Sequence, residues 1–310
     1  MKMNLANIKK AKKILDNNEC VAIPTETVYG LAGNAYSNKA CKKIFKLKKR
    51  PKSNPLIVHY HNIQNLKKDC IFNNDFIKLY KKFCPGPITF VLYLKKNSEI
   101  SKFATNYKKT LAVRFPKHPI TRKLLKKLDY PLAAPSANLS SKVSAVNSSD
   151  VRDDFGKKIK FILEGGKSSI GLESTIVDLR NKPKILRLGG LETSLIKKVL
   201  NKKVLINNNP LKISSPGQFK LHYSPGIPIS LNARKIKKGE ACLFINKTKE
   251  IRSNYYFLSK NGNLKEAARN LYSILRKIKK NKHKSIVVKK IPNKGLGKTI
   301  NDRLIRASKF

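Results

Sequence analysis

The sequence predicts an α/β protein of two domains, in which the larger, N-terminal domain contains a partly parallel sheet. Two observations indicate this fold class. Up to about residue 205, short runs rich in β-branched and aromatic residues alternate with longer stretches of helical periodicity. The segment 206–228 is dense in Asn, Pro, Ser and Gly and has no periodicity, so we expect a linker there. The alternation then resumes over about eighty residues, which suffice for a small second α/β domain.

Each domain has its own series of expected elements. In the N-terminal domain, 1–205, strands are expected at 20–24, 56–60, 88–94, 110–116, 131–135, 160–164, 174–179 and 185–188. Helices are expected over 39–49, 75–83 and 119–128, and near the N-terminus, where Leu5, Ile8 and Leu15 form the apolar side of an amphipathic helix. In the C-terminal domain, 229–310, we expect strands at 241–246, 255–259 and 285–291, a helix over 264–280 and a last helical stretch that ends at Phe310.

The chain is strongly basic. It carries 68 Lys and Arg against 18 Asp and Glu, a formal net charge of +50. Such a charge attracts polyanions such as nucleic acids. However, the excess is mostly lysine, is spread along the whole chain and comes with abundant asparagine, as a genome-wide codon bias would produce. Compositional bias and weak affinity for tRNA both stay open as interpretations.

The cysteines and the apolar segments bear on location. Five cysteines are scattered without a CxxC pair, so neither a zinc site nor a disulfide framework is supported. The N-terminus lacks the continuous apolar core of a signal peptide. No apolar run approaches the roughly 18 residues needed to cross a bilayer. We therefore expect a cytoplasmic protein without a membrane partner and without a metal bound by the protein alone.

Cationic side chains in unusual places are the first candidates for a site. Lys48 and Arg50 stand at the end of a helix that Pro51 prevents from continuing, just ahead of a strand. Two cations there can bind phosphates, the lysine as a compact charge and the arginine through its planar guanidinium. The alternative is a solvated basic helix end without a ligand. Arg114 lies inside an apolar strand, where a guanidinium must find an anion.

Polar side chains at strand ends add to these candidates. Ser136 and Asn138 follow a predicted strand, at the position where ligands of α/β sheets usually bind. His59 and His61 form an H-x-H pair, but no third ligand lies at a local spacing that would favour a metal. The carboxylates in distinctive segments are few and not closely paired: Glu26, Glu164, Glu173 and Asp178. Cations and backbone amides are therefore expected to carry the chemistry.

Seven segments, taken together and in order, resemble one known family. They are PTETVYGLAGNA, KLKKRPKSNPLIVHY, CPGPITFVL, TLAVRFPKHP, PLAAPSANLSSKVS, GLESTIVD and SPGQFKLHYSP. This series closely resembles the threonylcarbamoyl-AMP synthase family, also called the YrdC-domain family. The last segment is typical of its long form, in which a linker joins the YrdC-like domain, here with a twisted, mostly parallel or mixed sheet, to a smaller Rossmann-like domain. The resemblance covers nearly the whole chain.

The resemblance implies a reaction. Members of this family condense L-threonine, bicarbonate or carbon dioxide, and ATP to threonylcarbamoyl-adenylate and release pyrophosphate, with magnesium held by ATP. Other proteins, the downstream transferases, use the adenylate to modify an adenosine next to the anticodon of certain tRNAs. Several negative charges must meet in one cavity, which agrees with the cationic candidates.

The resemblance also implies site residues. Lys48 and Arg50 match catalytic positions. Threonine-binding positions match Thr27, His59, Arg114, Ala134 and Ser174. ATP-binding positions match Arg50, Asn54, Thr110, Ser136, Asn138, Ser144, Arg187 and Tyr223. In this interpretation PTETVYGLAGNA forms a pocket wall, in which the glycines allow the backbone to approach a ligand closely.

Two other functions stay open. A module that binds double-stranded RNA or tRNA would show strongly salt-dependent RNA affinity without forming an adenylate. A carbamoyl-transfer enzyme of related fold would use carbamoyl phosphate and ignore threonine.

Overall fold

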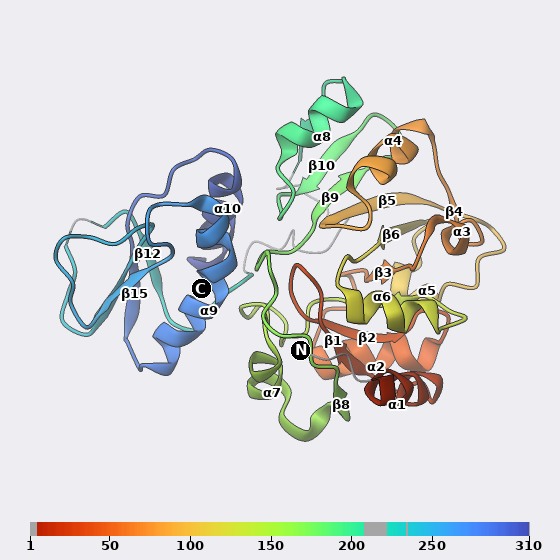
Figure 1. Cartoon of the computed structure of the whole chain (residues 1–310), viewed down its shortest axis with the longest axis horizontal. Coiled ribbons are helices and arrows are strands. Elements are labelled where there is room, and N and C mark those ends of the chain that lie inside the picture. Colours follow the sequence, from red (N-terminus) through yellow and green to blue (C-terminus); the bar gives the residue numbers. More distant parts are fainter. Residues whose placement is uncertain (1–4, 208–221, 234, 310) are drawn as a thin grey trace.

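The structure of the protein is a computed structural model that describes residues 5–207, 222–233 and 235–309. Two sheets organise these residues, and they lie in separate parts of the molecule (Figure 1). Most of the predicted linker, including 208–221, lies outside the described residues. The first sheet extends to residue 206, and the first strand of the second sheet begins at residue 229.

The first sheet is mixed and has eleven strands within the described residues. Their order is β11-β10-β9-β5-β6-β3-β7-β2-β1-β8, and β4 pairs with β5. The strands are β1 (Val21–Ile23), β2 (Gly30–Asn34), β3 (Ile57–His59), β4 (Cys70–Ile71), β5 (Ile88–Leu94), β6 (Thr110–Arg114), β7 (Leu132–Ala133), β8 (Phe161–Ile162), β9 (Thr175–Asp178), β10 (Lys184–Arg187) and β11 (Leu205–Ile206). Pairing is parallel for β3 with β6, β5 with β9, β1 with β8 and β10 with β11, and antiparallel elsewhere. The predicted α/β class is confirmed.

Helices cover both faces of this sheet. They are α1 (Leu5–Asp16), α2 (Asn38–Lys48), α3 (Ile63–Leu66), α4 (Asn74–Phe83), α5 (Lys102–Thr105), α6 (Pro119–Lys126), α7 (Ser148–Phe155) and α8 (Thr193–Leu200), with a 3-10 turn at Gly156–Lys158. On β1, Val21 and Ile23 join the core beneath α1 and α6, whereas Ala22 joins the larger core beneath α2, α4 and α8. This alternation follows from the two-residue period of a strand.

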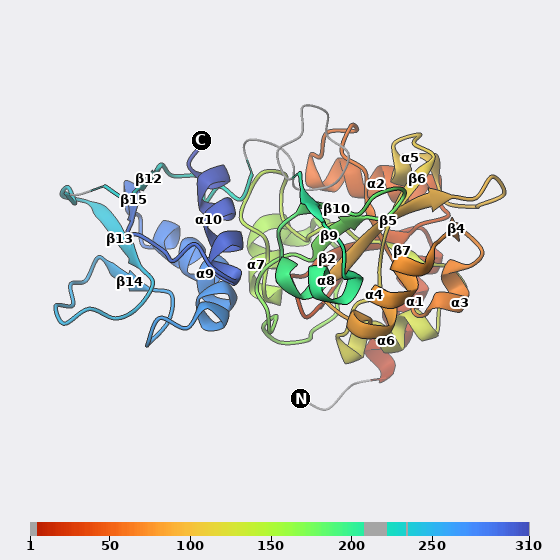
Figure 2. The same ribbon diagram turned by 90° about the horizontal axis from the view of Figure 1, so that it is seen from above.

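The second sheet is parallel and smaller. Its order is β12-β15-β13-β14. The strands are β12 (Ile229–Leu231), β13 (Glu240–Phe244), β14 (Tyr255–Phe257) and β15 (Ser285–Val288), and the helices are α9 (Leu264–Lys280) and α10 (Leu296–Ala307). Both helices lie between this sheet and the first part of the molecule (Figures 1 and 2). The C-terminal domain therefore meets the N-terminal one through α9 and α10, not through its strands.

Some sequence-based expectations need correction. Leu5 was expected on the apolar side of the first helix, but 56% of its surface is exposed, whereas Ile8 and Leu15 are buried. The strand β2 was not expected, because its sequence GLAGN contains two glycines and no β-branched residue. The strand expected at 131–135 is reduced to β7, since the prolines at its two ends cannot donate to the ladder.

The cysteines are free thiols, and most of them are buried. In the described ranges, no helix combines the length and the apolar character that a bilayer crossing requires. The cytoplasmic location stays a prediction.

Candidate active site

A cavity lies where the parallel strands β3 and β6 end and the strand β9 begins. Residues from eight parts of the chain line it: Thr27, Val28, Tyr29, Gly30, Arg50, Ile57, His59, Arg114, Ala134, Pro135, Ser136, Glu173, Ser174, Arg187, His222 and Tyr223. Three of these are arginines. The wall is therefore strongly cationic and is interrupted by hydroxyl groups.

The strand period places His59 and Arg114 in this cavity. They are the last residues of β3 and β6 and lie opposite each other in the parallel ladder. Their neighbours Val58 and Val113 point into the core on the opposite face of the sheet. Burial, followed by the charge of Arg114, holds the pKa of His59 well below its usual range, so the imidazole is neutral at pH 7. Its Nδ1 atom is buried and has no hydrogen-bond partner among the described residues.

Arg114 has an anionic partner within the protein. Its Nη2 donates to Glu26 Oε1 over 2.8 Å, and the two side chains are only 5% and 7% exposed. The second carboxylate oxygen of Glu26 accepts from the backbone N–H of Lys117 over 2.9 Å. Within the described part of the chain, the Nε–H of Arg114 has no acceptor. One edge of this guanidinium can therefore bind a further oxyanion.

Ser174 and Arg187 are held together beside Arg114. Arg187 Nη2 donates to the Ser174 carbonyl over 2.9 Å and lies 3.1 Å from Ser174 Oγ. Ser174 Oγ also shares a hydrogen bond of 2.7 Å with Thr89. Thr89 pairs with Arg114 across β5 and β6. A hydroxyl and a guanidinium thus occupy fixed positions on one wall.

Lys48, the last residue of α2, and Arg50, two positions later, have different surroundings. Arg50 lines the cavity and donates to the carbonyls of Asn54 and Pro55 over 3.0 and 2.9 Å. Burial, and next the charge of Arg187, lower the pKa of Arg50 to about 9, so it stays charged at pH 7. Lys48 is fully buried behind the wall, where its Nζ donates to the carbonyls of Ser136 and Asn138.

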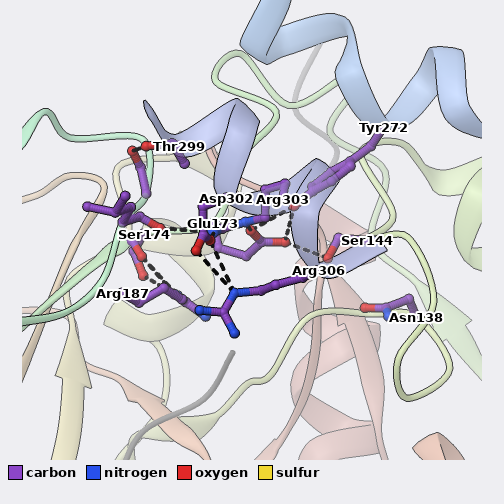
Figure 3. Close-up of polar contacts among 12 residues, drawn as sticks. Asn138, Ser144, Glu173, Ser174, Arg187, Tyr272, Thr299, Asp302, Arg303 and Arg306 are labelled. Atoms are coloured by element: carbon purple, nitrogen blue, oxygen red, sulfur yellow. Dashed lines mark hydrogen bonds and ion pairs between the residues drawn. The ribbon is translucent and has the colours of Figure 1, made fainter. Parts of the chain in front are cut away.

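Glu173 is the acidic member of the lining. Its carboxylate accepts from Ser144 Oγ over 2.6 Å, from the Tyr272 hydroxyl over 2.9 and 3.0 Å, and from Arg303 Nε over 3.0 Å (Figure 3). Burial raises the pKa of this carboxyl, but Arg303, Arg187 and the Ser144 hydrogen bond outweigh burial and lower the pKa to about 2. The carboxylate is therefore ionised and fully engaged.

Comparison with known proteins identifies the family. Residues 13–189 match the family described as "Telomere recombination", and residues 191–309 match the one described as "Threonylcarbamoyl-AMP synthase, C-terminal domain". The chain belongs to the threonylcarbamoyl-AMP synthase family. The resemblance inferred from the seven segments is thereby confirmed.

Relatives of similar length support the same family. The threonylcarbamoyl-AMP synthase of Pyrococcus abyssi is 33% identical, with 98% of this chain and 94% of the relative aligned. The threonylcarbamoyl-AMP synthase of Bacillus subtilis is 35% identical over the same shares. The crystal structure of P. abyssi Sua5 complexed with L-threonine has a TM-score of 0.91 at 32% identity, covering all of this chain and 96% of that one. E. coli YciO, at 23% identity and a TM-score of 0.55 over 60% of this chain and 90% of that one, shows a common fold for this part of the chain.

Most residues that the family resemblance implies lie around the cavity. Nine of them line it: Thr27, Arg50, His59, Arg114, Ala134, Ser136, Ser174, Arg187 and Tyr223. Their individual roles stay predictions. The segment PTETVYGLAGNA contributes Thr27 to Gly30 to the wall, but a Cβ on Gly33 would lie 3.3 Å from side chains of α2. That glycine allows close packing of helix on sheet, not the approach of a ligand.

The other implied residues are not part of the lining within the described ranges: Lys48, Asn54, Thr110, Asn138 and Ser144. Asn138 is buried, and its amide donates to the carbonyls of Leu139 and Lys142, which shapes the turn after Ser136. Asn54 is buried with its Oδ1 unpartnered among the described residues. Thr110 begins β6, at the opposite end from Arg114.

Sequence reasoning assigned no role to Glu173 and His222, which also line the cavity. The sequence offers one indication for Glu173: acidic residues are few in this chain, 18 in all, and this one stands directly before Ser174. Its partners Tyr272 and Arg303 are about a hundred residues or more away in sequence. Such pairing has no local sequence pattern.

Proposed function

We propose that this protein condenses L-threonine, bicarbonate or carbon dioxide, and ATP to L-threonylcarbamoyladenylate and pyrophosphate. One observation carries the proposal: Arg50, Arg114 and Arg187 all line one cavity whose other walls present hydroxyl groups. A carboxylate, a carbamate and a triphosphate together need such a concentration of positive charge. The L-threonine complex of P. abyssi Sua5, a relative of nearly equal length, supports the amino-acid substrate.

Arg114 is the proposed partner of the threonine carboxylate. Its unpartnered Nε edge is available for that anion while Nη2 stays on Glu26. Thr27, His59, Ala134 and Ser174 line the same cavity and are the proposed neighbours of the bound threonine. A neutral His59 and hydroxyl groups can hydrogen-bond the amine, the carbamate and the side-chain hydroxyl of threonine.

Arg50 and Arg187 are the proposed partners of ATP. In the reaction, the threonine amine binds carbon dioxide and loses a proton, and a carbamate oxygen then attacks the α-phosphorus while pyrophosphate leaves. Fixed guanidinium groups stabilise the charge that builds on the phosphates. The proposed neighbours of the nucleotide are Asn54, Thr110, Ser136, Asn138, Ser144 and Tyr223. Lys48 is proposed to support the segment that carries Ser136.

Magnesium is the proposed cofactor, and it would arrive with ATP. No group of three His, Cys, Asp or Glu that could hold a metal occurs within the described residues. A triphosphate supplies most of the oxygen ligands that magnesium prefers, so a site with few protein carboxylates fits this ion. Among the described residues, Asn54 Oδ1 has no hydrogen-bond partner and would be an oxygen ligand. When bound, magnesium would neutralise the triphosphate and the departing pyrophosphate.

The adenylate would serve a second reaction. We propose that transferase proteins use it for threonylcarbamoyladenosine modification of tRNA next to the anticodon. The decisive experiment measures pyrophosphate release from ATP while threonine, bicarbonate and magnesium are omitted in turn. Release that needs all three supports the proposal. Equal release with serine, or with no amino acid, would contradict it.

A further inference from the structure

An arginine of the C-terminal domain is buried against the wall of the cavity. Arg303 lies on α10 and is 1% exposed. Its Nε donates to Glu173 over 3.0 Å, and its Nη2 donates to the carbonyl of Leu188 over 2.6 Å. One guanidinium thereby binds two segments of the N-terminal domain that are separate in sequence, and Figure 3 shows Arg303 beside Glu173.

In each of these segments, the residue that Arg303 contacts is directly adjacent in sequence to a residue that lines the cavity. Glu173 precedes Ser174, and Leu188 follows Arg187. The two segments also touch directly, because a Cβ on Gly189 would lie 2.3 Å from the backbone nitrogen of Thr175. A shift of either segment would therefore move the pair formed by Ser174 and Arg187.

Other groups of the C-terminal domain reinforce the same contact. Tyr272 on α9 donates to both oxygens of Glu173 over 2.9 and 3.0 Å. Thr299 on α10 donates to the carbonyl of Gly189 over 3.1 Å. The Arg303 guanidinium carbon also lies 4.5 Å from the ring centre of Tyr223, which lines the cavity and stacks on Tyr272.

Charge balance explains why the contact matters. Glu173 is buried, and a buried carboxylate must be paired and hydrogen-bonded. Arg303 and Tyr272 supply this pairing from outside the N-terminal domain. Without them, Glu173 would keep the hydroxyl of Ser144 and would be drawn to Arg187, whose charge already acts on it.

We propose that Arg303 is a positioning residue for the synthase reaction: it fixes Glu173 and Leu188 so that Ser174 and Arg187 face the substrates in one arrangement. The C-terminal domain is then a part of the active-site wall, acting through α9 and α10. This inference rests on the proposed function for its kinetic effects, whereas its structural effect is measurable without turnover.

The test compares single variants in the full chain. Arg303→Met keeps the apolar stem and removes the guanidinium, and it should raise the half-saturating concentration of threonine or ATP at least about tenfold. Arg303→Lys can replace one hydrogen bond but not both, so it should recover only part of the affinity. Hydrogen exchange at 171–175 and 185–190 should become faster in Arg303→Met.

Two further variants separate positioning from stability. Asp154→Asn removes another ion pair between the domains, the 2.8 Å contact of Asp154 with Arg276, which does not touch the cavity. It should leave substrate affinity and exchange at both segments within about twofold of wild type. The double variant Arg303→Met with Glu173→Gln removes both buried charges, so it should recover thermal stability but not substrate affinity.

The outcomes distinguish this inference from the proposed function. Wild-type protein that releases no pyrophosphate with threonine and bicarbonate would overturn the proposed function, while the exchange measurement would still judge Arg303. Unchanged exchange at both segments in Arg303→Met would overturn the positioning role, whatever the activity. Equal effects of Arg303→Met and Asp154→Asn on affinity would also overturn it, because both would then reflect domain docking alone.

Discussion

Arg114, in the wall of the cavity, forms an ion pair with Glu26, with 2.8 Å between Nη2 and Oε1. The pair satisfies the charge of Arg114 before any ligand binds. In the proposed reaction, a threonine carboxylate would therefore share the guanidinium with Glu26 by binding its Nε edge, which has no partner among the described residues. Only a planar group with several donors can serve both anions at fixed angles.

The first prediction concerns this sharing. Arg114→Lys should raise the half-saturating concentration of threonine at least about tenfold, roughly 1.4 kcal/mol, because an ammonium cannot make the two-edged contact. Titration of threonine at saturating ATP measures the change. Arg152→Lys is the control, since Arg152 forms an exposed ion pair with Glu164. An unchanged half-saturation in Arg114→Lys would mean that Arg114 only anchors Glu26.

The second prediction concerns Lys48, which we infer acts from behind the wall. Lys48→Met removes the donor for the carbonyls of Ser136 and Asn138, so the segment that carries Ser136 should move. We expect turnover at saturating substrates to fall by about tenfold or more, with a loss of about 1–3 kcal/mol of folding free energy from two unpaired carbonyls. Steady-state kinetics well below the melting temperature separates the two effects. Lys46→Met, on the exposed side of the same helix, is the control; equal turnover in both variants would contradict this role.

The third prediction concerns acid stability. Glu173 has a pKa lowered to about 2 in the folded protein, below its value in the unfolded chain. Its contribution to stability is therefore fully present above pH 4.5 or so and is lost as the pH falls toward 2. From the shift, this contribution is roughly 3 kcal/mol. Burial also lowers the pKa of His222 to about 3, so its neutral form favours folding, and this contribution is lost between about pH 6.5 and 3.

Urea unfolding at a series of pH values tests the assignment to Glu173. The slope of unfolding free energy against pH below 4.5 should become smaller in Glu173→Gln, while the slope between pH 6.5 and 4.5 should stay. Glu164→Gln is the control, because that carboxylate is exposed and its ion pair with Arg152 lies at the surface. Equal slopes below pH 4.5 in wild type and Glu173→Gln would show that other groups cause the acid sensitivity.

Much of this site could be predicted because its signals are local. An arginine within an apolar strand, such as Arg114, and hydroxyl groups after strand ends, such as Ser136, are visible in a short window of sequence. The missed parts depend on distant packing. The strand β2 forms from a glycine-rich segment because β1 and β7 flank it, and tertiary pairing overrides its weak β propensity. Glu173 acquires its role through partners such as Tyr272 and Arg303, which are 99 and 130 residues away.

The last prediction concerns Tyr223, at the end of the predicted linker. Its side chain is 1% exposed and lines the cavity; its ring stacks on Tyr272, and the Arg303 guanidinium carbon lies 4.5 Å from the ring centre. We propose that it excludes water from the adenylate, since closing a site protects a hydrolysable intermediate. The earlier part of that linker, from residue 208 to 221, lies outside the described residues, so the prediction rests on Tyr223 alone.

Tyr223→Ala should lower the yield of adenylate per pyrophosphate released, because removal of the ring lets water reach and hydrolyse the product. Tyr223→Phe is the matched control: the hydroxyl has no partner among the described residues, so its loss should leave the yield close to wild type. Both products are measured in the same reaction, by chromatography for the adenylate and a coupled assay for pyrophosphate. A full yield in Tyr223→Ala would show that the ring has no protective role. A low yield in Tyr223→Phe would instead show that the hydroxyl, and not the ring, contacts the nucleotide.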